Sequence, residues 1–76
     1  MALLDAAAED REVNERLAVW RAIEALPPLE RETIVLDFVE GHRHEEIAEQ
    51  MGVSVATVRS RLQSAKRKLR SDLRTL

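Results

Sequence analysis

Apolar residues recur at the spacing of an α-helix along nearly the whole chain. Strand-like alternation of apolar and polar residues is limited to Val53 and Val55, which flank Ser54. A helix returns to the same face every three or four residues and a strand every two, so the pattern favours helices throughout. It predicts an all-α domain of four helices.

The first two predicted helices are separated by a proline pair. A helix is expected over about residues 10–25, and Pro27 and Pro28 end it because proline lacks a backbone N–H. Pro28 also suits the first turn of a second helix, expected over residues 28–40 with Gly41 just past its end. The apolar side of the first helix is formed by Val13, Leu17, Trp20 and Ile23. The second helix carries Leu29, Ile34, Val35, Phe38 and Val39.

The last two predicted helices are joined by a short turn that contains glycine. Residues 44–51 are expected to form a helix, Gly52 to end it, and Ser54 to cap the next one. This last helix runs to about residue 74 and would be about 30 Å long at 1.5 Å per residue. Its predicted buried stripe is formed by Val58, Leu62, Ala65, Leu69 and Leu73.

The chain has 76 residues, enough for one small domain. Residues 1–9 are expected to be a linker or a lead-in with little fixed structure, and residues 10–76 to form the domain. The absence of cysteine excludes disulfides and thiolate metal sites. No apolar run approaches the roughly 18 residues of a membrane span or resembles a signal peptide, so a soluble cytoplasmic protein is expected.

The net charge of −2 conceals a division along the chain. Residues 1–53 contain 13 acidic and five basic side chains, a balance of −8. Residues 54–76 contain seven basic side chains and one acidic side chain, a balance of +6. Such asymmetry indicates a nucleic-acid or other anionic partner for the basic part.

The segment from residue 45 to residue 70 combines a short helix, a glycine turn, a serine cap and a long basic helix. A helix-turn-helix joins two helices at about 90–120° through a short turn and places the second helix in the DNA major groove. Ala48 is small enough to let the two helices approach closely, and Gly52 can adopt the turn conformation. The sequence therefore predicts a C-terminal helix-turn-helix without winged elements.

The outward face of the last helix lies opposite its buried stripe on a helical wheel. The outward residues are Ala56, Ser60, Gln63, Ser64 and Arg67, flanked by Thr57, Arg59, Lys66 and Arg70. Arg59 can form two hydrogen bonds with guanine and Gln63 two with adenine, whereas Thr57 or Ser60 can serve either base. The basic residues further along suit phosphates, which position a protein without specifying sequence. These residues are Lys66, Arg67 and Arg70.

At these positions the chain resembles region 4 of the bacterial sigma-70 family, and most closely the extracytoplasmic-function (ECF, group 4) sigma factors. The resemblance covers residues 25–70 and, weakly, the helix before them. It rests on motifs in matching order and at matching distances. They are Leu26-Pro27, the Glu- and Arg-containing segment 29–40, Gly41, Glu45-Glu46-Ile47-Ala48, Gly52, Ser54 and Thr57-Val58-Arg59-Ser60-Arg61-Leu62.

The resemblance implies that the last helix recognises the minus-35 promoter element. It also implies contact with the flap of the RNA polymerase β subunit, occlusion by an anti-sigma factor, and a place in the bacterial cytoplasm at the nucleoid. From this resemblance and the helical wheel together, the residues expected to lie near DNA bases are Ala56, Arg59, Ser60 and Gln63. The expected contacts to the DNA backbone are Thr57, Arg61, Ser64, Lys66, Arg67 and Arg70.

Three positions depart from the family pattern. Arg43 stands where the family has a capping Ser or Thr, so the start of the third helix is expected to be weaker by about 1 kcal/mol. Asp37 replaces a base that helps relatives to hold DNA, and Ser64 replaces a frequent Arg. These departures affect which sequence is bound and how tightly.

The sequence is also compatible with two alternatives. A LuxR/GerE-type output domain also has Gly, Glu-Ile-Ala and Thr-Val at similar spacing, but it typically continues Lys-Asn-His, whereas Arg59-Ser60-Arg61 follows here. A module held mainly by an anti-sigma factor would instead expose apolar side chains for that partner to bury. The side chains that test this idea are Val35, Phe38, Val39, Leu69, Leu73 and Leu76.

Other features have simpler explanations. Trp20 is expected in the core, because a lone Trp on an apolar helical stripe is more often buried than exposed. His42 and His44 match no recognised zinc pattern, so no metal or other cofactor is expected. The basic helix could lie on an anionic membrane, but its serine cap and the lack of aromatic residues on its apolar side argue against this. No catalytic machinery or small-molecule site is visible, so the protein is not expected to be an enzyme.

Overall fold

The computed structural model describes residues 2–74, and the side chains of residues 13–74 within that range. It contains four α-helices and one π-helical segment: α1 (Ala2–Glu24), α2 (Pro28–Ile34), η1 (Val35–Val39), α3 (His44–Met51) and α4 (Val55–Leu73). No strand occurs among the described residues. The all-α prediction is confirmed.

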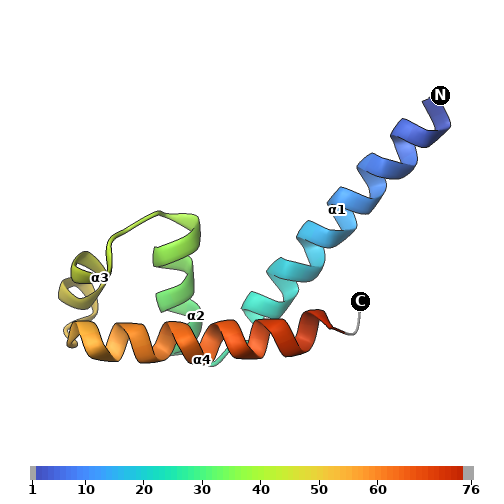
Figure 1. Cartoon of the computed structure of the whole chain (residues 1–76). Coiled ribbons are helices and arrows are strands. Elements are labelled where there is room, and N and C mark those ends of the chain that lie inside the picture. The colour runs from blue at the N-terminus through green and yellow to red at the C-terminus, as the bar shows by residue number, and fades with distance from the viewer. Residues whose placement is uncertain (1, 75–76) are drawn as a thin grey trace.

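Helix α4 is the element against which the others pack (Figure 1). Helix α3 lies against the N-terminal end of α4, α2 crosses near the middle of α4, and the C-terminal end of α1 meets its C-terminal half. The rest of α1 extends away from the other helices (Figure 1). The outward face of α4 is therefore left uncovered along its length.

The core lies between α4 and the three helices packed on it. Ile34, Ile47 and Val58 are its largest fully buried apolar side chains, one each from α2, α3 and α4. Burying such a side chain contributes roughly 1.5–3 kcal/mol. The remaining members of the cluster are Ile23, Leu26, Ala48, Leu62 and Ala65. The first three positions of the predicted stripe of α4 are thus buried, whereas Leu69 and Leu73 are half-buried.

The turn between α3 and α4 follows the sequence-based expectation. Gly52 has a φ of 67°, in the left-handed region that favours glycine, and the N–H of Val53 donates to the carbonyl of Ala48 at 3.0 Å. Ser54 then caps α4, because its Oγ accepts a hydrogen bond from the N–H of Thr57 at 3.1 Å. The predicted helix end and helix cap are confirmed.

The predicted second helix is divided into α2 and η1. The N–H of Glu40 donates to the carbonyl of Val35 at 3.1 Å, the five-residue step of a π-helix. Each such wider turn shifts the residues that follow by about 100° around the axis, relative to a continuous α-helix. Phe38 and Val39, expected on the apolar stripe of that helix, lie within η1 and are 64% and 50% exposed.

The first helix differs from its prediction in two respects. It begins at Ala2 and not near residue 10, because the alanines and leucines of residues 2–9 are strong helix formers. Trp20 is 46% exposed, so its expected place in the core is wrong. The C-terminal end of α1 packs on the other helices, and among the described side chains of α1, those of residues 13–24, Ala22 and Ile23 are buried there.

Candidate nucleic-acid interface

The N-terminal half of α4 presents a short polar surface to solvent. Arg59, Ser60 and Gln63 are exposed, and Ala56 is exposed beside them. They lie on the side of α4 opposite the buried Val58 and Leu62. The structure thus brings the four residues expected near DNA bases onto one open face.

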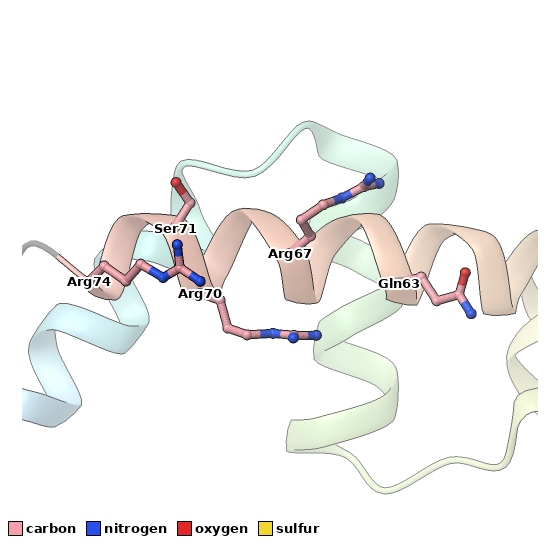
Figure 2. A pocket seen from close by; sticks show the side chains of 5 residues that line it. All are labelled: Gln63, Arg67, Arg70, Ser71 and Arg74. Atoms are coloured by element: carbon pink, nitrogen blue, oxygen red, sulfur yellow. The ribbon is translucent and has the colours of Figure 1, made fainter.

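The C-terminal half of α4 continues this face with arginines. Figure 2 shows Gln63, Arg67, Arg70, Ser71 and Arg74 projecting from successive turns of α4, where they line a shallow depression. Arg67, Arg70 and Arg74 are all exposed. Arg74 was absent from the expected DNA contacts, although its spacing of seven residues from Arg67 places it on the same side of the helix. None of the five residues that line the depression is acidic.

Thr57 and Arg61 are less available than expected. The hydroxyl of Thr57 lies 3.0 Å from Oγ of Ser54, within the cap of α4. Arg61 is half-buried, and its Nη1 atom is buried without a hydrogen-bond partner. These two expected backbone contacts lie beside the open face of α4 and not on it.

Ser64 faces α2 and not the open face of α4. Its Oγ donates a hydrogen bond of 2.6 Å to Oε1 of Glu30, and Nζ of Lys68 donates one of 2.8 Å to Oε2 of the same carboxylate. These two hydrogen bonds lower the pKa of Glu30, that to Lys68 most strongly. The expected phosphate contact of Ser64 does not agree with this geometry. A helical wheel assigns Ser64 to the outward side because it represents a single helix and does not include the neighbouring α2.

Lys66 lies at the edge between the DNA-facing side of α4 and the segment η1. Its Nζ atom is 5.3 Å from the centroid of the Phe38 ring, a cation–π distance, and its side chain is half-buried. Lys66 is therefore shared between two surfaces, which its place in the sequence did not indicate.

The start of α3 retains part of a cap despite Arg43. Oε1 of Glu46 accepts a hydrogen bond from the backbone N–H of Arg43 at 3.2 Å and one from its Nε at 3.1 Å. The hydrogen bond from the Arg43 side chain is the main cause of a lowered pKa for Glu46, followed by that from the Arg43 backbone. The expected weakening of this helix start is thus offset in part by Glu46.

The two histidines lie near α3. Nε2 of His44 lies 3.7 Å from Oδ1 of Asp37, and Nδ1 of His42 is hydrogen-bonded to Nε2 of Gln50 at 2.8 Å. Within the described residues, no three potential metal-ligating side chains of the His, Cys, Asp or Glu type come together. Helices of this part of the chain also lack the length and apolarity needed to cross a bilayer.

An apolar groove separates the end of α1 from η1 on the side of α4. It encloses about 440 Å³, and its lining residues are Val19, Trp20, Ile23, Ile34, Phe38, Val39, Lys66, Leu69, Arg70 and Leu73. Trp20, Phe38 and Val39 are exposed there, whereas Leu69 and Leu73 are half-buried. Val35 is also half-buried but does not line the groove. Leu76 lies outside the described residues. Several of the side chains that test for an interaction surface are therefore open to a partner.

Comparison with known families decides the classification of this helix-turn-helix. The sequence model of sigma-70 region 4 matches residues 16–69, from the middle of α1 to Leu69 in α4. The chain belongs to the sigma-70 region 4 family. The matched part of region 4 contains the whole of α2, η1 and α3, and the N-terminal three quarters of α4.

Two curated sigma factors are similar to this region 4 chain. The probable RNA polymerase sigma factor RfaY of Xanthomonas campestris pv. campestris is 37% identical over 62 residues, which cover 82% of this chain and 16% of that protein. The ECF RNA polymerase sigma factor SigE of Mycolicibacterium smegmatis is 42% identical over 52 residues, which cover 68% of this chain and 20% of that protein. The chain therefore spans a fifth or less of the length of each relative.

Proposed function

We propose that this chain is the promoter-binding region 4 of an ECF sigma factor and that α4 reads the minus-35 element. The observation that carries the proposal is the division of one open helix face into a short polar part and an arginine-rich part. Arg59, Ser60 and Gln63 would contact bases, and Arg67, Arg70 and Arg74 would contact phosphates. Residues 10–76 would form the DNA-binding unit, acting at the nucleoid in the bacterial cytoplasm.

The family match favours this function over that of a LuxR/GerE output domain. The acidic surface of the other helices supports it as well, because a balance of −8 over residues 1–53 repels phosphates and leaves α4 as the favourable side for DNA. Binding by such a module involves no chemical step, since α4 only docks and forms hydrogen bonds.

We also propose that the apolar groove receives a protein partner, with the flap of the RNA polymerase β subunit as first candidate and an anti-sigma factor as second. The supporting observation is the exposure of Phe38 at 64% and Trp20 at 46% in a groove that α4 closes on one side. An amphipathic helix that buried these rings would gain roughly 25 cal/mol for each Å² of apolar surface covered.

The test is a selection of bound sequences from a random DNA pool, with and without RNA polymerase core. A common motif in the selected pool, with binding that weakens as salt is raised, is the expected result. Recovery of random sequences in both arms would contradict promoter binding. A motif recovered with polymerase only would show that the partner is needed to hold region 4 on DNA.

A further inference from the structure

Glu30 joins the first turn of α2 to the middle of α4. Its two carboxylate oxygens are used separately, since Oε1 accepts from Ser64 at 2.6 Å and Oε2 accepts from Lys68 at 2.8 Å. These partners lie 34 and 38 residues away along the chain. The Glu30 side chain is only 15% exposed, whereas the Lys68 side chain is 47% exposed, so the Ser64 side of the bridge is the better shielded from solvent. Charge-assisted hydrogen bonds of this length are among the stronger polar contacts in proteins.

The position of this bridge matters because of where it meets α4. Ser64 follows Gln63 directly, and Lys68 follows Arg67, so the bridge holds α4 at the junction between its base-facing and phosphate-facing parts. The apolar stripe that also holds α4 is non-directional, whereas hydrogen bonds depend on angle and distance. The bridge is therefore suited to fix the rotation of α4 about its axis and its sliding along the core.

The bridge also engages two groups of α4 that could otherwise contact DNA, the hydroxyl of Ser64 and the ammonium group of Lys68. With Lys68 paired to Glu30, its ammonium group is partly neutralised on the α2 side of the helix. The same hydrogen bonds favour the charged form of Glu30 by lowering its pKa. The carboxylate therefore remains negative near neutral pH.

We propose that Glu30 is a positioning residue for DNA recognition, which acts by holding α4 through Ser64 and Lys68 and makes no contact with DNA itself. This inference rests on the proposed function of DNA binding. It predicts that loss of the bridge lowers the preference for the cognate sequence but not the general attraction to DNA. A loosened α4 no longer presents Arg59 and Gln63 at one fixed orientation, whereas Lys68 becomes free to attract phosphates.

The experiment compares Glu30→Gln with Glu32→Gln in the 76-residue chain. Glu32 is exposed on the same helix, so its substitution removes the same charge from α2 while leaving the bridge intact. Affinities are measured by fluorescence anisotropy for the DNA selected by the wild-type chain and for a scrambled duplex of equal composition. For Glu30→Gln we expect the ratio of the two affinities to fall roughly three- to tenfold, with affinity for the scrambled duplex unchanged or raised. For Glu32→Gln we expect the ratio to stay at its wild-type value.

Three results would overturn the inference. The first is a Glu30→Gln chain whose ratio of affinities for the selected and the scrambled duplex equals that of the wild type. The second is a Glu30→Gln chain that loses affinity for both duplexes in parallel. The third is a fall of this ratio in Glu32→Gln as large as that in Glu30→Gln. If Glu30→Gln does not fold by circular dichroism, Ser64→Ala tests the same bridge, because it removes one hydrogen bond and keeps the ion pair with Lys68. Its ratio should fall by roughly twofold or more, and an unchanged ratio would count against the bridge. A wild-type chain that shows no sequence preference either alone or together with RNA polymerase core would instead contradict the proposed function.

Discussion

Nζ of Lys66 lies 5.3 Å from the centroid of the Phe38 ring, so a cation of the DNA-facing helix is held over an aromatic residue of the neighbouring groove. The contact joins α4 to η1 and places Lys66 between the proposed DNA surface and the proposed partner surface. Arg70 occupies a similar border, since it lines both the depression on α4 and the apolar groove. The side chains of Lys66 and Arg70 therefore lie where the proposed DNA surface meets the proposed partner surface.

The position of Lys66 predicts that it contributes less to DNA binding than Arg67 does. Arg67→Ala should reduce the slope of log affinity against log salt by about 0.9, the value for one phosphate contact. Lys66→Ala should reduce the slope by less than half as much, because its ammonium group is directed to Phe38. Salt titrations of both variants on one duplex measure the two slopes. A larger change for Lys66 than for Arg67 would contradict the proposed division of contacts.

Arg59 is expected to contribute to sequence preference. Arg59→Ala should cost about 1–3 kcal/mol of binding free energy on the selected DNA and relax the preference at one base. Arg67→Ala is the matched control, since it removes another exposed arginine from the same helix but should weaken binding to all sequences alike. Titrations with cognate and scrambled duplexes check this. Equal losses on both duplexes for both variants would refute a base contact by Arg59.

The apolar groove is expected to carry the contact with polymerase. Phe38→Ala should lower affinity for RNA polymerase core at least fivefold, because the ring is 64% exposed and would be buried by the partner. Leu29→Ala is the control, since Leu29 is 54% exposed but does not line the groove. The protein has one tryptophan, Trp20, and it lines the groove, so a blue shift of its fluorescence should report occupation. Equal affinities of both variants for core polymerase would place the contact elsewhere.

The carboxylates of Glu30 and Glu46 are expected to make the fold sensitive to acid. Both have a folded-state pKa below the usual value of 4.5, so each stabilises the fold above that value and loses its contribution as the pH falls through the folded-state pKa. The positive groups that act on Glu30 are Lys68 and Arg67. Thermal unfolding between pH 7 and pH 3 should therefore show a smaller acid-induced fall of the midpoint in Glu30→Gln than in the wild type. Identical pH profiles would show that the pKa of Glu30 does not change on folding.

Gly52 is expected to be required for backbone geometry and not for space. A Cβ atom added there would meet no heavy atom within 4 Å, but the φ of 67° is unfavourable for residues with a side chain. Gly52→Ala should lower the free energy of unfolding by about 1–2 kcal/mol. Glu49→Ala, an exposed change in the preceding helix, should stay within about 0.5 kcal/mol. Denaturant unfolding of the two variants provides the measurement, and equal stabilities would show that the left-handed turn is not maintained in solution.

The sequence by itself determined the features that depend on short-range chemistry. The proline pair, Gly41, Gly52 and Ser54 mark the helix ends, because each acts on the backbone within a few residues. The periodicity of α4 predicted its buried residues and left Ala56, Arg59, Ser60 and Gln63 on the exposed side, as the structure has them. The motif order was sufficient to identify the family.

Only the tertiary structure decided which residues on the flanks of α4 remain open. Ser64 and Lys68 turn towards Glu30, and Lys66 towards Phe38, because α2 and η1 lie beside those flanks, and a helical wheel contains no information about neighbouring helices. Trp20 is exposed for a related reason, since α1 packs only at its end. Contacts between residues 28 or more positions apart depend on how helices are placed in space, which local periodicity does not specify.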